Sequence, residues 1–172
     1  MARDNSKITF KGAPLTIVGK ALKVGEALPT VTLTAQDMSD VSTSKFSGKP
    51  LLVSTVPSLD TPVCSIETRR FNQEASKLGD KVTILTISRD LPFAQKRWCA
   101  AEGATNLQVA SDFKTLQTGQ AFGVHIQEWA LLTRAIFVAD AQGKLTYVEY
   151  VDDVSSEPNY ENALKALAAT LE

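Results

Sequence analysis

The sequence predicts an α/β fold built around a parallel sheet, and three observations support this prediction. Two dense runs of apolar and β-branched residues, at 51–56 and 82–88, are typical of buried central strands. The segment that joins them has the spacing of an amphipathic helix, and a second helical segment follows. Strand, helix and strand in this order form the unit from which parallel sheets are built.

Two N-terminal regions alternate between apolar and polar residues. Residues 7–11 and 14–18 flank a turn that contains glycine, and they predict an N-terminal β-hairpin over about residues 7–19. Residues 31–34 and 40–43 predict two further short strands on either side of a polar turn. We expect both regions to be peripheral to the central strands.

The central helix is predicted over residues 62–78. Pro57 ends the strand before it, and Gly79 follows its last residue. Its inner face is marked by apolar or small residues at helical spacing, at positions 64, 67/68, 71, 75 and 78.

The second helix has its own start and stop signals. Asp90 is a candidate cap, Pro92 stands near the first helical position, and Gly103 ends the segment. Cys99 therefore falls in its last turns. Residues 115–122 predict another short helix.

The last part of the chain predicts an antiparallel hairpin and a helix. Residues 135–140 and 145–151 flank a turn at Gln142 and Gly143, and residues 161–171 form an amphipathic helix. This order of elements is the pattern of a thioredoxin-like α/β fold with an N-terminal β-hairpin extension. The sequence shows no repeat, linker or change of composition, so we expect residues 1–172 to form a single domain.

Composition and charge exclude several classes of protein. A hydrophobic share of 44% and a charged share of 22% are those of a globular protein rather than a disordered one. A net charge of −1 disfavours nucleic acid and anionic lipid as partners. The first seven residues contain no apolar run, so we expect neither a signal sequence nor a membrane segment. We therefore expect a cytoplasmic protein. Two cysteines, Cys64 and Cys99, and one histidine, His125, disfavour a metal site.

Cys64 occupies a position that favours reactivity. It follows a central strand, where open parallel sheets place their sites. Thr61 is the natural N-cap of the next helix and Pro62 its first residue, so Cys64 is the third residue of the first turn. The unpaired N–H groups and the dipole of a helix start favour a thiolate over a thiol. The alternative is that Cys64 is a small buried hydrophobic residue.

Several motifs carry a resemblance to a known family. Residues 57–64, Pro-Ser-Leu-Asp-Thr-Pro-Val-Cys, resemble the active-site loop of peroxiredoxins, and the wider context is similar to the bacterial thiol peroxidase branch, an atypical 2-Cys type. This resemblance covers nearly the whole chain. The further motifs that carry it are residues 65–71, 90–95, Cys99, Glu102 with Gly103, residues 111–113, Arg134, and residues 157–160.

The resemblance implies a role for each residue of the site. Cys64 is the peroxidatic cysteine, Thr61 holds the peroxide through its hydroxyl, and Pro57 shields the sulfur from water. Arg134 is the cation of the active site and can follow the charge that develops on the departing oxygen. The alternative for Arg134 is a surface salt bridge at the start of a strand.

The same resemblance implies that Cys99 is the resolving cysteine, which forms an intramolecular redox disulfide with Cys64. The two cysteines lie on different predicted helices, whereas a disulfide needs Cα atoms within about 7 Å, so local unwinding is expected during turnover. The alternative for Cys99 is a packed core thiol beside Trp98. We expect His125 to be an ordinary residue of a loop or helix end.

The activity implied is that of a cofactor-free, thiol-dependent peroxidase that reduces hydrogen peroxide and organic hydroperoxides. Its role would be antioxidant defence, with thioredoxin as reductant and a homodimer as the assembly. A second hypothesis is a thiol-based redox sensor or relay protein that uses the same two cysteines. A thioredoxin-like disulfide oxidoreductase is disfavoured, because the cysteines lack the C-x-x-C spacing.

Two departures from the family pattern stand out. Ala100 follows Cys99 where the family often has glycine, and we expect this change to leave the chemistry intact. Residues 127–133 are shorter than usual and lack the glycines that normally precede Arg134. We expect the second departure to affect the pocket wall, and with it substrate preference and the dimer surface.

Overall fold

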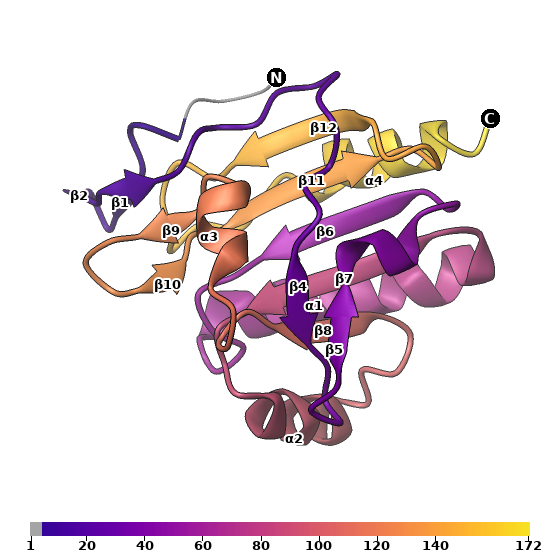
Figure 1. Cartoon of the computed structure of the whole chain (residues 1–172), viewed down its shortest axis with the longest axis horizontal. Coiled ribbons are helices and arrows are strands. Elements are labelled where there is room, and N and C mark those ends of the chain that lie inside the picture. The colour runs from indigo at the N-terminus through magenta and orange to yellow at the C-terminus, as the bar shows by residue number, and fades with distance from the viewer. Residues whose placement is uncertain (1–4) are drawn as a thin grey trace.

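The computed structural model describes residues 5–172, so residues 1–4, the start of the segment expected to carry no signal sequence, lie outside it. Within the described residues a mixed sheet of seven strands crosses the molecule, with the order β12-β11-β6-β7-β8-β4-β5 (Figure 1). Its strands are, in chain order, β4 (Thr32–Thr34), β5 (Asp40–Ser42), β6 (Leu51–Thr55), β7 (Thr83–Ser88), β8 (Gln108–Ser111), β11 (Ala135–Ala139) and β12 (Leu145–Tyr150).

The centre of the sheet confirms the predicted parallel unit. Strand β6 pairs in parallel with β7, and β7 pairs in parallel with β8, while β11 runs antiparallel to both β6 and β12. Both faces of the central strands are covered. Along β11, Phe137 packs into one core, whereas Ile136 and Val138 pack into the other, as the two-residue period of a strand requires.

Helices cover the two faces unequally. The long helices α1 (Pro62–Leu78), α2 (Pro92–Glu102) and α4 (Tyr160–Ala169) lie on one face, and the short α3 (Gln117–Ala121) lies on the other with N-terminal segments (Figure 1). The core beneath the long helices holds both cysteines and includes Leu52, Cys64, Phe71, Trp98, Cys99, Ile136 and Leu167. None of the helices within residues 5–172 has a segment long and apolar enough to cross a membrane.

The bounds of the helices follow their local signals. Helix α1 has the predicted bounds, because Pro62 starts it and Gly79 ends it at φ +61°. Two 3-10 turns, η1 (Thr43–Phe46) and η2 (Gly79–Lys81), were not predicted. Helix α4 begins at Tyr160 rather than Glu161, because the Asn159 side chain accepts a hydrogen bond from the N–H of Asn162 and caps it.

The N-terminal hairpin is confirmed but shorter than predicted. Strands β1 (Thr9–Phe10) and β2 (Ala13–Pro14) form it, and the expected strand over 14–18 is interrupted. The second half of the expected strand is β3 (Ile17–Val18), which pairs with β9 (His125–Ile126) instead of with β1.

A second small sheet therefore forms away from the hairpin, in which β10 (Leu131–Leu132) completes the order β10-β9-β3. The chain leaves the hairpin at Thr16, whose N–H donates to the Glu128 carboxylate and whose carbonyl accepts from the N–H of Gln127. These long-range bonds have no local sequence signal, which is why the alternation suggested one continuous strand.

One further expectation needs correction. Asp90 does not cap α2, because Leu91 occupies the N-cap position and its backbone is extended.

The strands β4 and β5 lie at the edge of the main sheet, peripheral to the central strands as expected, although Leu33 of β4 is fully buried in the core. Strand β8 was not predicted, since its four residues Gln-Val-Ala-Ser contain a single β-branched apolar side chain.

Candidate active site

Cys64 lies in the first turn of α1, directly after the loop that follows β6. The N-cap position is held by Thr61 in an extended conformation, Pro62 follows it, and Cys64 is fully buried. The Thr61 hydroxyl does not cap the helix as expected. It donates to the carbonyl of Ser58 at 3.0 Å and so stabilises the preceding loop instead.

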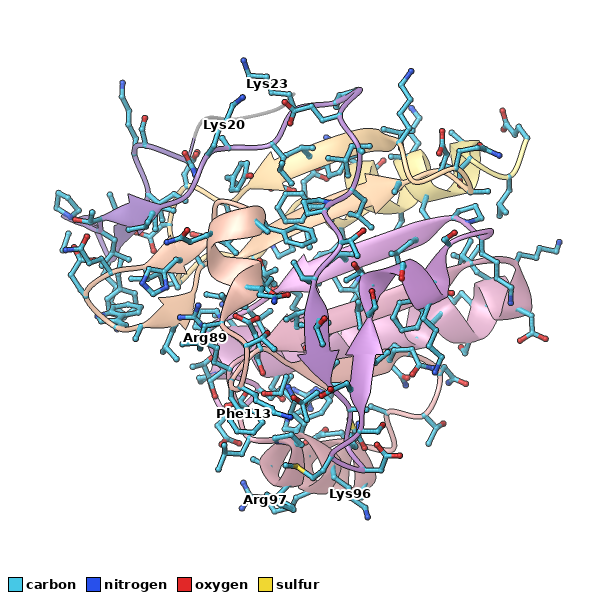
Figure 2. All side chains as sticks on the ribbon, viewed as in Figure 1. Lys20, Lys23, Arg89, Lys96, Arg97 and Phe113 are labelled. Atoms are coloured by element: carbon cyan, nitrogen blue, oxygen red, sulfur yellow. The ribbon has the colours of Figure 1, made fainter. Side chains whose placement is uncertain are left out.

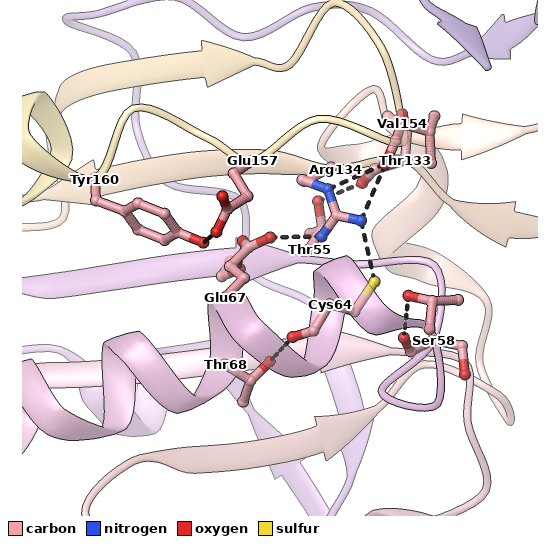
Figure 3. Close-up of polar contacts among 12 residues, drawn as sticks. Thr55, Ser58, Cys64, Glu67, Thr68, Thr133, Arg134, Val154, Glu157 and Tyr160 are labelled. Carbon is pink, nitrogen blue, oxygen red and sulfur yellow. Dashed lines mark hydrogen bonds and ion pairs between the residues drawn. The ribbon is translucent and has the colours of Figure 1, made fainter. Parts of the chain in front are cut away.

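Arg134 contacts the Cys64 sulfur directly. Its Nη2 donates to Cys64 Sγ at 3.2 Å and to the carbonyl of Val154 at 3.0 Å, and its Nη1 pairs with Glu67 at 2.5 Å (Figure 3). The side chain is 1% exposed. The alternative of a surface salt bridge is therefore wrong. Burial opposes the charged form, but Glu67 and Cys64 raise the pKa of Arg134, so the guanidinium stays a cation.

Glu67 completes the site and was not singled out from the sequence. It lies three residues after Cys64, so both side chains share one face of α1. Ser54 of β6 donates to its carboxylate at 2.7 Å. Burial raises the pKa of Glu67, while Arg134 and Ser54 act in the opposite direction. A charged residue on the apolar face of a predicted helix was the signal that could have identified it.

The backbone around Arg134 is fixed on several sides. The Thr55 hydroxyl donates to the carbonyl of Thr133 at 2.9 Å, and the N–H of Thr133 donates to the carbonyl of Val124 at 2.7 Å. The N–H of Val151 donates to the carbonyl of Arg134 itself. These bonds tie the start of β11 to β6 and β12, so the guanidinium approaches Cys64 from a rigid frame.

The loop before α1 is held by Asp90. Its carboxylate accepts hydrogen bonds from the Ser58 hydroxyl at 2.7 Å, the N–H of Leu59 at 2.8 Å and the Ser88 hydroxyl at 2.6 Å. The residue expected to cap α2 therefore positions the loop that carries Pro57 and leads to Cys64.

A cavity of about 510 Å³ opens beside this site. Pro57, which is buried, and Thr61 line it together with Arg134, so the structure brings three of the predicted residues around one space. The buried Cys64 sulfur does not line this cavity but contacts Arg134, which does. The rest of its wall is mostly apolar and consists of Phe10, Lys11, Pro62, Val63, Trp129, Leu131, Val154 and Ser155. A space of this kind can admit a small polar molecule or an apolar group.

Cys99 lies apart from these residues. It is 8% exposed in α2, and both cysteines are free thiols. Its sulfur accepts a hydrogen bond from Gln36 Nε2 at 3.5 Å, and its carbonyl accepts from the N–H groups of Gly103 and Ala104. Burial raises the pKa of Cys99, and the bond from Gln36 opposes this shift. Cys99 lines a different cavity, of about 640 Å³.

His125 belongs to β9, not to a loop or helix end as expected. Its Nδ1 lies 2.9 Å from Arg89 Nη1. Within residues 5–172, no three His, Cys, Asp or Glu side chains are grouped closely enough to hold a metal ion.

Known proteins resemble this chain in sequence and in fold. The sequence profile of the Redoxin family matches residues 23–164. The chain is 47% identical to "Thiol peroxidase" of Bacillus subtilis over 164 residues, which cover 95% of this chain and 98% of that protein. It is 51% identical to "Thiol peroxidase" of Oceanobacillus iheyensis over 162 residues, which cover 94% and 98%.

Solved structures resemble the chain over almost its full length. A peroxiredoxin-like protein from Aquifex aeolicus superposes with a TM-score of 0.91 at 35% identity and covers 98% of this chain and 99% of that one. A thiol peroxidase from Chromobacterium violaceum has a TM-score of 0.86 at 20% identity, covering 96% and 97%, which shows the shared fold. The predicted thioredoxin-like α/β fold and the resemblance to bacterial thiol peroxidases are thus confirmed. This protein belongs to the Redoxin family.

Proposed function

We propose that this protein is a thiol-dependent peroxidase that reduces hydrogen peroxide and organic hydroperoxides, with Cys64 as the peroxidatic cysteine. One observation carries the proposal: the buried Cys64 sulfur lies 3.2 Å from the guanidinium of Arg134, which lines a cavity beside it. The relatives named thiol peroxidase support it.

In the first step the Cys64 thiolate attacks one peroxide oxygen in line with the O–O bond. A sulfur–oxygen bond forms and the O–O bond breaks, and its electron pair leaves on the departing oxygen, which takes a proton to become water or an alcohol. Cys64 is thereby oxidised by two electrons to a sulfenic acid. We assign to Arg134 the stabilisation of the charge on the departing oxygen.

Thr61 and Pro57 are assigned roles at the entrance to the sulfur. The Thr61 hydroxyl forms one hydrogen bond with the bound peroxide, as donor or as acceptor. For this the hydroxyl must turn away from the carbonyl of Ser58, to which it donates in the structure. Pro57 has no N–H group and is buried against the cavity, which fits its proposed role of excluding water from Cys64.

In the second step the Cys99 thiolate attacks the sulfur of the sulfenic acid, a disulfide forms, and hydroxide leaves and is protonated to water. The two cysteines occupy different helices. The Cys99 sulfur accepts a hydrogen bond from Gln36, and both residues line a different cavity from the one beside Arg134. A disulfide requires Cα atoms within about 7 Å, so we propose that the last turns of α2 or the first turn of α1 unwind locally.

Thioredoxin is the proposed reductant of the disulfide, and the cytoplasm is the proposed compartment.

A homodimer is the proposed assembly. The family resemblance supports this assembly, and we assign to its interface the exposed side chains of Leu91 (52% exposed) and Phe93 (65% exposed). Sedimentation of the protein and of its Phe93→Asp variant tests this proposal, which a monomeric parent protein would contradict.

The function is tested by NADPH consumption with thioredoxin, thioredoxin reductase and either hydrogen peroxide or cumene hydroperoxide. We expect rapid turnover that Cys64→Ser abolishes, whereas Cys99→Ser permits the first oxidation and blocks recycling. Rapid turnover by Cys64→Ser would refute the assignment. Slow single oxidation with stable mixed disulfides would instead favour the redox sensor.

A further inference from the structure

We propose that Arg89 is a positioning residue for the outer wall of the active-site cavity. It acts through the β9–β10 loop, residues 127–130, and places Trp129 where it contacts the organic part of a hydroperoxide. This inference rests on the proposed function and assigns a determinant of substrate preference within it.

One side of the Arg89 guanidinium is fixed to the main sheet. Arg89 directly follows β7, and its side chain is 7% exposed. Its Nε pairs at 3.2 Å with the carboxylate of Asp112, which is fully buried and also accepts from the N–H of Thr118 at 3.0 Å. The position of the guanidinium relative to the sheet is therefore set by a buried ion pair.

The other side of the guanidinium holds the β9–β10 loop. Arg89 Nη1 donates to the carbonyl of Ala130 at 2.5 Å and lies 2.9 Å from His125 Nδ1 (Figure 2 shows Arg89 beside β10). Because a guanidinium has no acceptor, His125 must accept through Nδ1 and is neutral in this arrangement. One side chain thus links the ends of β7 and β8 to β9 and to the loop.

Glycine at position 119 leaves the space for this arrangement. A Cβ added to Gly119 would lie 2.6 Å from Arg89 Nη2 and 2.9 Å from the Cβ of His125. Any larger residue would displace the guanidinium or the histidine.

The loop needs such support because of its backbone. Ala130 has φ +54°, in the left-handed region that favours glycine, and residues 127–133 contain no glycine. A strained residue persists where the surroundings fix it on both sides. The N–H of Ala130 donates to the carbonyl of Ile126 at 2.9 Å, and its carbonyl accepts from Arg89. Without Arg89 the peptide would relax toward an ordinary conformation.

Trp129 precedes this strained residue and forms part of the cavity wall. Its ring meets that of Phe10 edge to face, with centroids 5.0 Å apart. Both line the cavity that Pro57 and Arg134 also line. Hydrogen peroxide has no apolar group to place against this wall, whereas an organic hydroperoxide has one. A shift of Trp129 should therefore lower reactivity toward the organic substrate alone.

The test compares Arg89→Met with Arg69→Met in a Cys99→Ser background, where oxidation of Cys64 is measured alone (Arg89 is labelled in Figure 2). Arg69 is a matched control because its side chain is 49% exposed, pairs with Glu102 on α2 and does not line the cavity. We expect Arg89→Met to lower the rate constant for cumene hydroperoxide about tenfold and to change that for hydrogen peroxide less than about twofold. An equal loss with both peroxides, or none with either, would overturn the inference.

A double-mutant cycle tests the path through Trp129. If Arg89 acts through Trp129, then Trp129→Ala has the same selective effect, and adding Arg89→Met to it costs little more. Trp129→Ala also keeps the inference testable if Arg89→Met does not fold. An unchanged rate of Trp129→Ala with cumene hydroperoxide, or fully additive effects, would refute it.

A fluorescence measurement separates this inference from the proposed function. Trp98→Phe leaves Trp129 as the single tryptophan. We expect Arg89→Met to increase quenching of Trp129 by acrylamide, since the loop is released. Unchanged quenching would overturn the inference, whereas failure of Cys64 to react with either peroxide would refute the peroxidase instead.

Discussion

The two cysteines lie in one apolar core and are both buried, yet their surroundings differ in charge. The sulfur of Cys64 faces a buried cation that a carboxylate and a backbone carbonyl hold in place. The sulfur of Cys99 faces a neutral amide, and burial raises its pKa. Burial alone therefore does not make the two thiol sites equivalent. They differ in whether a fixed cation is present to stabilise charge at the sulfur.

The comparison is tested most strongly by Arg134→Met. This substitution removes the cation and leaves an apolar side chain of similar length beside Cys64. We expect the rate constant for oxidation of Cys64 by hydrogen peroxide to fall about 1,000-fold, the upper range for loss of one oriented donor. Stopped-flow measurement in a Cys99→Ser background checks it, and a loss below about threefold would contradict the role of the cation.

Glu67→Leu should be the most damaging change for stability. It leaves the Arg134 guanidinium buried without its carboxylate partner, so we expect the free energy of unfolding to fall by about 3 kcal/mol. Urea denaturation measures this loss. Glu74→Leu is the control on the same helix, because its pair with the exposed Lys77 should contribute less than about 1 kcal/mol. Equal losses in both variants would contradict the special role of the buried pair.

Gln36→Leu tests the surroundings of the other thiol. Without the amide hydrogen bond, the pKa of Cys99 should rise further, since burial then acts alone. In a Cys64→Ser background, the midpoint of the pH profile for alkylation of the Cys99 thiol should shift to higher pH. The rate of alkylation at pH 8 should fall a few-fold, which corresponds to the loss of about one weak hydrogen bond. A downward shift would show that Gln36 does not stabilise the thiolate of Cys99.

His125 is a titratable reference outside both thiol sites. Burial and the charge of Arg89 lower its pKa, while Asp112 opposes them. The unfolded chain therefore binds a proton near pH 6.5 that the folded protein does not bind, so stability falls as the pH falls below about 6.5.

This loss should be smaller in His125→Gln. We expect the free energies of unfolding of the parent protein and of His125→Gln to diverge as the pH falls from 7.5 to 5.5. The divergence should be less than about 1.4 kcal/mol per pH unit. Urea denaturation across this range measures the divergence, and parallel curves would contradict it. The rate of Cys64 oxidation by hydrogen peroxide should remain the same in both proteins.

Local signals predicted much of the fold. Pro62 and Gly79 act on their own neighbours, so the bounds of α1 could be read from the sequence. Strand β8 and the pairing of β3 with β9 depend on partners distant in the chain, and no local pattern indicated them. Asp90 shows the same limit, because its three partners in neighbouring loops and strands outweigh its preference for a helix start.

The site divides in a similar way. The position of Cys64 followed from strand and helix signals, whereas the importance of Arg134 came from the family resemblance, since 70 residues separate the two. Glu67 was hidden for a different reason. Its charge contradicted the apolar face on which it lies, and only its pairing with Arg134 explains why a carboxylate is tolerated there.

The carbonyl of Cys99 accepts the two N–H groups that close the C-terminal end of α2, from Gly103 and Ala104. Backbone displacement of this cysteine therefore opens both amides to solvent at once. If the proposed disulfide forms by unwinding of this end of α2, hydrogen exchange at these two amides will be slow with free thiols and fast with the disulfide formed. The same opening would expose this end of α2 to proteases in the oxidised form.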